Sequence, residues 1–326
     1  MARWRNIQPR PPQDYAGWLL TSYPLAVFLV GHWLFDQIGK PFADHVLQAA
    51  TSIAKGGNPN EVIADGHVWA ATAHAYLVFS MFMLIYLGRW LGAQARRRTA
   101  AAHVCIAATL MAVGTGFLEY VHIGNRPMNA IFLFTYQSVA GSELLASMQM
   151  VAFINRTLIL INLLGIIAPA ALIALVPLLV REPISGWTER ELILRVRETQ
   201  TLGLLASILL ALGVLHMYAW MSWAPELLNK QQLETVVGSV TFYWGSVFTL
   251  MLAAIYLPAL MMLQKRSEIV MDALQVPLID RAEWLRCRGL SLKIFNQVPQ
   301  AIGILAPLIA APAGRLLANL GQLTPK

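Results

Sequence analysis

Four ionisable side chains form two pairs inside or at the ends of long apolar segments, where charge is costly and therefore points to function. His32 and Asp36 are four residues apart, and Glu119 and His122 are three apart. These spacings place each pair on one face of a helix, so its members can hydrogen-bond or ligate together. Such pairs could hold a metal ion or attract cations.

One interpretation of these groups is a membrane redox protein that binds copper, iron or haem. Its ligands would come from His32, His74, Glu119, His122 and His216. Glu-x-x-His is the spacing of carboxylate-bridged di-metal bundles, which need two such motifs and two further glutamates. The sequence has one such motif, no HxxxH cluster and no pair of histidines placed for stacked haems. Metal or haem binding is therefore the alternative, and we expect no cofactor.

The leading interpretation is a pore whose outer mouth collects cations. On the outer side predicted below, eight acidic residues face five basic ones, a balance that favours cations. The last apolar segment adds hydroxyl groups within about one helical face, although such hydroxyls also bond to their own helix. The candidate pore and mouth residues are Asp36, Glu119, His122, Glu143, Thr241, Ser246 and Thr249.

Basic residues gather on the other side, where 19 of them face nine acidic residues. Such a surface attracts anionic lipids, nucleotides or nucleic acid. Topology alone explains most of these arginines, but three groups exceed what orientation requires. The candidate anion-binding residues are Arg96, Arg97, Arg98, Arg190, Arg197, Arg286, Arg288 and Lys293.

The elements that must position these groups are apolar helices. Of the 326 residues, 57% are hydrophobic and only 13% are charged, against roughly 25% charged in a soluble domain. Long apolar runs without period-2 alternation favour helices over a barrel. Six segments reach the ~20 residues of a spanning helix, namely 17–35, 68–91, 101–123, 157–180, 201–223 and 237–263. We therefore predict an all-α fold, a polytopic membrane bundle of six transmembrane helices.

The distribution of Lys and Arg predicts the orientation of this bundle. The 19 basic residues lie before the first span, in two alternate connections and after the last span, and cytoplasmic segments retain such residues. We therefore predict a protein of the bacterial inner membrane with both termini in the cytoplasm. The chain divides into a basic leader (1–16) without a cleavage pattern, a spanning domain (17–263) and a helical cytoplasmic tail (264–326).

Three segments do not fit a plain span. Residues 42–54 follow a Lys-Pro break and have the apolar spacing of a short outer interfacial helix. Residues 128–154 are apolar but carry several polar groups, and we predict an interfacial or re-entrant hairpin. In the tail, prolines at 299, 307 and 312 should interrupt any long helix. This apolar tail needs a partner, such as residues 188–199, a second copy of the chain or the membrane surface.

Familiar enzyme motifs are missing from the sequence. It has no Walker loop, no GxGxxG after a strand, no GxSxG, no HExxH and no TVGYG-like filter. Its two cysteines, Cys105 and Cys287, fit neither a disulfide framework nor a zinc site. An enzyme that acts through a common motif is therefore not expected.

Together these patterns predict a homo-oligomeric ion channel or membrane-depolarising protein, with a pore lined mainly by the fourth to sixth spans. Its basic cytoplasmic surface would sense a nucleotide or nucleic acid. In layout the chain resembles the multi-span membrane effectors of bacterial anti-phage systems, which depolarise the cell when such a signal changes. The likeness is architectural and has no residue motif behind it. An accessory subunit of a larger membrane complex is a further alternative.

Overall fold

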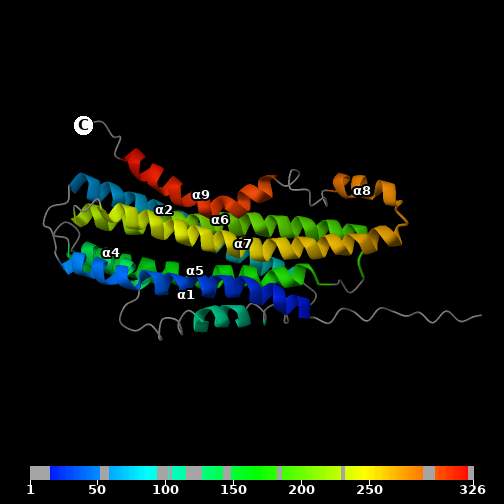
Figure 1. Cartoon of the computed structure of the whole chain (residues 1–326), viewed down its shortest axis with the longest axis horizontal. Helices are drawn as coiled ribbons and strands as arrows, with labels where there is room; N and C mark the ends of the chain where they lie inside the picture. Colours follow the sequence, from blue (N-terminus) through cyan, green and yellow to red (C-terminus); the bar gives the residue numbers. More distant parts are fainter. Residues whose placement is uncertain are drawn as a thin grey trace, which may run out of the picture.

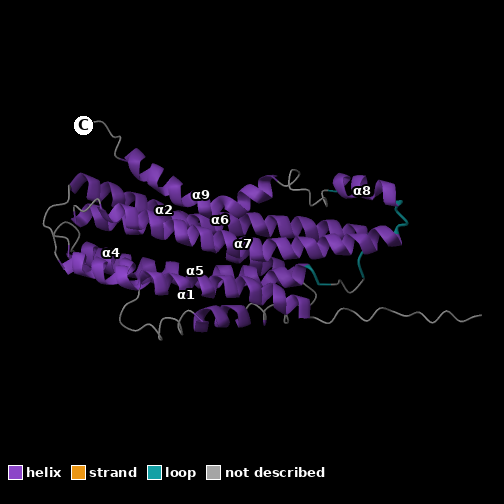
Figure 2. Cartoon of the chain, viewed as in Figure 1, coloured by secondary structure: helices purple, strands orange, loops and turns teal. Residues whose placement is uncertain are grey.

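The computed structural model is a helical bundle throughout the part of the chain that it describes (Figures 1 and 2). The described residues are 15–51, 59–93, 102, 105–114, 127–141, 148–181, 186–228, 232–288 and 298–321. Every regular element in these ranges is a helix, so the predicted all-α class is confirmed.

Long helices, most of them nearly antiparallel to their neighbours, run along one axis (Figure 1). In chain order they are α1 (Tyr15–Thr51), α2 (Pro59–Ala93), α4 (Pro127–Gly141), α5 (Met148–Leu179), α6 (Glu189–Leu228), α7 (Gln232–Ala273) and α9 (Val298–Gly321). A short 3-10 helix, Leu278–Asp280, leads into α8 (Arg281–Cys287). A further ten-residue apolar helix is Cys105–Gly114.

Four of the described helices are long and apolar enough to cross a membrane. They are Val62–Gly92, Met148–Leu179, Glu189–Ala224 and Glu234–Ala273. These correspond to the predicted second, fourth, fifth and sixth spans. The predicted first span lies within α1, and most of the third (101–123) falls outside the described residues. The total of six spans and the cytoplasmic termini therefore stay predictions.

The second half of α5 is the centre of the bundle. Nearly every residue from Ala168 to Leu179 is buried, on all sides of the helix, because α1, α2, α6 and α7 pack around it. A helix that is apolar all round needs such an enclosed place. The expected pore lining therefore does not include this half of the fourth span, since it is enclosed within a single chain.

Two helices continue where prolines were expected to end them. Helix α1 runs through the Lys40–Pro41 step to Thr51, so 42–51 is the end of α1 and not a separate interfacial helix. Helix α9 likewise contains Pro307 and Pro312, and bends along its length (Figure 1). In apolar surroundings a helix keeps its remaining backbone hydrogen bonds, so proline kinks it without breaking it.

The segment predicted as a hairpin, 128–154, falls on two helices. Helix α4 ends at Gly141 and α5 begins at Met148, while residues 142–147 lie outside the described part. Helix α4 packs against α1 and α6, and α5 continues from Met148 into the predicted fourth span.

Helix α9 lies along α6 and α7. An ideal Cβ on Gly245 of α7 would come within 2.7 Å of the Pro307 carbonyl oxygen, so the two backbones are in close contact. Farther along α9, an ideal Cβ on Gly314 would come within 2.8 Å of the Tyr218 ring of α6. From its start near mid-bundle, α9 runs away from α8 toward the end where α2 begins (Figure 1). Residues 188–199 were one of three partners predicted for this tail, and α9 instead meets α6 beyond them, at Ser207 and Tyr218.

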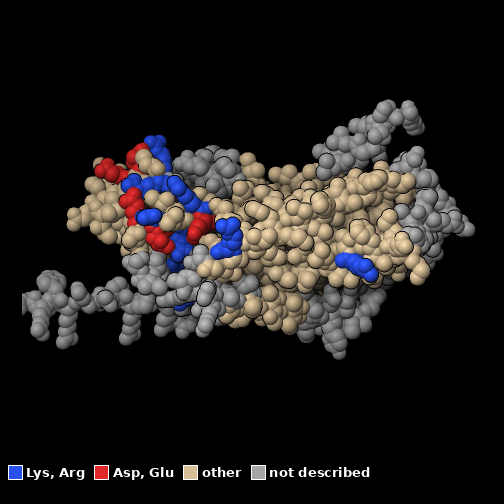
Figure 3. Space-filling view, turned by 180° about the vertical axis from the view of Figure 1, so that it is seen from behind, with Lys and Arg blue, Asp and Glu red and all other residues tan. Residues whose placement is uncertain are grey.

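Charged side chains gather at one end of the bundle (Figure 3). We call this the charged end: residues 188–198 of α6, 264–273 of α7 and 278–288. On the face shown in Figure 3, the long middle of the molecule is almost free of charge. The charged end holds eight basic and seven acidic side chains, so charge is separated from the apolar bundle, while the basic excess on this side stays a prediction.

Candidate functional site

A buried acid–histidine pair lies on α1. The Nε2 atom of His32 is 3.6 Å from Oδ2 of Asp36, one turn away. Asp36 is only 3% exposed, although the surrounding core is apolar. The spacing of this pair in the sequence correctly indicated their contact.

Helix α7 closes over the pair because Gly31 lets the two backbones approach. An ideal Cβ on Gly31 would be 2.8 Å from a methyl group of Val247. The Tyr243 hydroxyl donates a 2.7 Å hydrogen bond to the Gly31 carbonyl, and the Trp244 ring meets the His32 ring edge-on, with centroids 5.8 Å apart. A carboxylate and an imidazole held this way can accept and release a proton or bind a cation.

A second buried histidine, His216 of α6, sits in an aromatic box. Its ring stacks on Tyr76 of α2 at 6.1 Å and lies 6.4 Å from the ring of Trp69. Trp69 also packs against Trp220, one turn from His216. Neither nitrogen of His216 has a hydrogen-bond partner among the described residues. The site is therefore mainly apolar packing, which holds α2 against α6.

This aromatic box was not predicted from the sequence. A signal was present: Trp69 and Tyr76 are seven residues apart, and His216 and Trp220 are four apart. Both spacings put large rings on a single helix face. Nothing in the sequence indicated that these two faces, 140 or more residues apart, pack against each other.

The proposed metal ligands do not come together in the described structure. His32 lies against α7, His216 lies against α2, and the His74 side chain is exposed. Glu119 and His122 fall outside the described residues. Within the described part of the chain, no group of three His, Cys, Asp or Glu residues could hold a metal ion. No observation therefore favours the copper, iron or haem alternative.

The hydroxyl groups of the predicted pore face are turned to their own helix. Thr241 is fully buried and donates to the carbonyls of Val237 and Gly238. Ser246 donates to the Phe242 carbonyl. The Thr249 hydroxyl is buried without a partner among the described residues. The lining of a pore by Thr241, Ser246 and Thr249 stays a prediction, and Glu143 lies outside the described residues.

At the charged end, several predicted anion-binding residues are engaged in ion pairs. Arg288 reaches Glu189 at 2.5 Å and lies over the Trp284 ring at 4.2 Å, which ties α8 to the start of α6. Arg286 pairs with Glu283 at 2.8 Å. Arg190 and Arg197 are exposed and make no ion pair with a described residue. Residues 96–98 and 293 lie outside the described part.

The pairs on α8 also change proton affinities. The hydrogen bond from Arg286 lowers the pKa of Glu283, with a smaller lowering from the Cys287 thiol. The same carboxylate accepts a 3.2 Å hydrogen bond from Cys287. This bond stabilises the protonated thiol and raises the pKa of Cys287.

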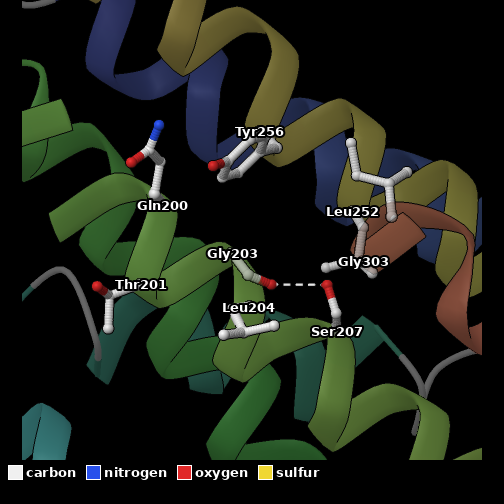
Figure 4. A pocket seen from close by; sticks show the side chains of 9 residues that line it. Gln200, Thr201, Gly203, Leu204, Ser207, Leu252, Tyr256 and Gly303 are labelled. Atoms are coloured by element: carbon white, nitrogen blue, oxygen red, sulfur yellow. Dashed lines mark hydrogen bonds between the residues drawn. The ribbon is translucent and has the colours of Figure 1, made fainter. Parts of the chain in front are cut away.

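A cavity of about 200 Å³ lies between α6, α7 and α9, close to the charged end (Figure 4). Its lining residues are Gln200, Thr201, Gly203, Leu204, Ser207, Leu252, Tyr256, Gly303 and Ile304. Ser207 satisfies its hydroxyl by donating to the Gly203 carbonyl at 2.7 Å. The Tyr256 hydroxyl has no such partner among the described residues.

Comparison with known proteins adds no relative. No family model, no curated protein and no solved structure matches this chain. The interpretation of the site therefore depends on its own geometry.

Proposed function

We propose that this chain is a multi-pass membrane protein that conducts cations, protons included, and that the His32–Asp36 pair lies in the conduction path. The observation that carries the proposal is the burial of this pair, with Asp36 3% exposed in an apolar bundle. Ionisable groups are retained at such a place because they serve transport or proton relay. The apolar helices long enough to cross a membrane support the location.

The described arrangement favours a path along the α1–α7 contact. The hydroxyls of Thr241 and Ser246 on α7 bond to their own helix, and the second half of α5 is enclosed. Among the described residues, the His32–Asp36 pair on α1 is therefore our candidate for the conduction path. Tyr243 places a further hydroxyl beside it.

We further propose that the protein works as a homo-oligomer in a bacterial inner membrane, with the charged end facing the cytoplasm. Apolar side chains exposed on the bundle, such as Phe82, Ile85, Phe153 and Leu163, supply surface for lipid or for a second copy. Arg190 and Arg197 at the charged end, which are exposed and make no ion pair with a described residue, supply a binding surface for an anionic ligand. A role in depolarising the cell, as in anti-phage effectors, follows from such gated conduction.

Reconstitution tests this function. Purified full-length protein in liposomes should dissipate an imposed potassium or proton gradient, measured with a pH-sensitive or potential-sensitive dye. Parallel liposomes should contain the same protein after heat denaturation, as a control for leakage. Liposomes that stay ion-tight with and without nucleotide or nucleic acid would contradict the proposal.

A further inference from the structure

The exposed residues of α6 near the charged end form one continuous stripe. Its members are Arg190, Leu194, Arg197, Thr201, Leu204 and Ile208. Their spacing alternates between four and three residues, which keeps them on one face of the helix. The stripe is basic at its start and apolar from Leu204 onward, like the profile of a membrane leaflet from headgroup to acyl chain.

The cavity between α6, α7 and α9 opens beside this stripe. Thr201 and Leu204 belong to both the stripe and the cavity lining, and Leu204 is half-exposed at the mouth. Arg197 lies one turn before Thr201, on the side of the charged end. An elongated molecule that enters here would meet a positive charge first and an apolar wall next.

One polar group that lines the cavity makes no hydrogen bond with any described residue. Tyr256 is 95% buried, and its hydroxyl makes no hydrogen bond to a described residue. In Figure 4 the hydroxyl oxygen lies on the side of Gln200, toward the charged end of the cavity. A buried hydroxyl without a partner is costly, so this position favours a ligand with an acceptor such as an ester or carboxyl oxygen.

We propose that this site binds one anionic phospholipid. An acyl chain would occupy the cavity, its ester region would accept a hydrogen bond from Tyr256, and its phosphate would lie against Arg197 and Arg190. The cavity volume of about 200 Å³ is smaller than the ~300–1,000 Å³ that encloses a whole drug-sized ligand. It therefore takes only part of one acyl chain, while the rest of the lipid stays in the bilayer.

The inference depends on the membrane location in the proposed function but not on conduction. Ion-tight liposomes would remove the channel and leave lipid binding measurable. If the liposomes conduct ions but the protein binds both lipids equally, only the lipid-site proposal fails.

Native mass spectrometry of the delipidated full-length protein can measure the binding. Phosphatidylglycerol should bind more tightly than phosphatidylcholine. Each arginine near an anionic headgroup should contribute about fivefold in affinity, so Arg190→Gln with Arg197→Gln should weaken phosphatidylglycerol binding by roughly 25-fold. Leu204→Trp should block the mouth, and Tyr256→Phe should weaken both lipids alike. Lys265→Gln, at the same end but off the stripe, should change nothing.

Equal binding of the two lipids would overturn the proposal, as would unchanged binding in Leu204→Trp with a folded protein confirmed by circular dichroism. Soluble anions provide a separate arm with inorganic phosphate and ATP as the probes. If either binds with the same dependence on Arg190 and Arg197 and without dependence on Leu204, the stripe is a soluble-anion site and the lipid proposal fails.

Discussion

The indole Nε1 of Trp223 on α6 donates a 2.9 Å hydrogen bond to the carbonyl oxygen of Val62 on α2, across 161 positions of the chain. Gly66 makes the approach feasible, since an ideal Cβ there would lie 2.9 Å from the Trp223 ring. The bond therefore fixes the register between the two helices next to the His216 box.

Trp223→Phe should lower the free energy of unfolding by about 1 kcal/mol more than Trp220→Phe, because both changes replace a buried indole by a smaller ring but only the first also removes a buried hydrogen bond. Trp220→Phe is the matched control, since the Trp220 nitrogen has no partner among the described residues. Thermal unfolding in detergent measures the difference. Equal losses in the two variants would show that the Trp223 hydrogen bond contributes nothing.

The position of α9 can be tested by a cross-link. An ideal Cβ on Gly303 lies 3.7 Å from the Cβ of Ser207, within the range of disulfides. In a chain with Cys105→Ser and Cys287→Ser, the pair Gly303→Cys and Ser207→Cys should form a disulfide in membranes under mild oxidant. Protease cleavage between α7 and α9 followed by non-reducing electrophoresis would detect it.

The control for that cross-link moves one partner along α6. In the pair Gly303→Cys and Ser222→Cys, the α6 cysteine lies about 22 Å farther along the helix than position 207. No disulfide should therefore form. An α9 that stays outside the bundle would give no disulfide in either pair.

The backbone contact between α7 and α9 predicts a difference between two glycines. Gly245→Val should destabilise the protein by about 1–3 kcal/mol, because the new methyl groups meet the Pro307 carbonyl. Gly238→Val on the same helix should be tolerated, since its ideal Cβ has no neighbour within 4 Å. Similar unfolding temperatures for both variants would argue against the α7–α9 contact.

Cysteine reactivity tests the α8 network. Since the Glu283 carboxylate raises the pKa of the Cys287 thiol, less thiolate is present at any pH below that value, and alkylation is slowed. Glu283→Gln should lower this pKa and speed iodoacetamide labelling at pH 8, measured by mass spectrometry. Cys105 in the same sample is the internal control. An unchanged labelling rate of Cys287 in Glu283→Gln would rule out the Glu283–Cys287 contact.

Composition and local periodicity predicted the helical class, the four of six predicted spans that are long apolar helices in the described structure, and the His32–Asp36 contact, because each depends on residues close in sequence. The continuation of α1 beyond Pro41 and the length of α9 were not predictable from the local effect of proline. An apolar environment holds the helix together where water would compete for its backbone. The contacts of Trp223 with Val62 and of Gly303 with Ser207 depend on tertiary pairing that the sequence alone did not reveal.

The pore hydroxyls show the same limit within one helix. Thr241, Ser246 and Thr249 share a face by spacing, and spacing cannot tell a water-lined face from one whose hydroxyls bond to their own carbonyls. In the structure Thr241 and Ser246 both donate to carbonyls of their own helix. The buried acid Asp36 is therefore the group on which the conduction proposal depends most.

The most direct measurement of the central claim is proton and potassium flux through proteoliposomes that contain Asp36→Asn. Glu234→Gln, an exposed acid on α7, is the matched control, and circular dichroism confirms that both variants are folded. We expect the Asp36→Asn flux to fall at least tenfold, equivalent to about 1.4 kcal/mol, while Glu234→Gln conducts like the natural chain. Unchanged flux in folded Asp36→Asn protein would contradict a conduction path through the His32–Asp36 pair.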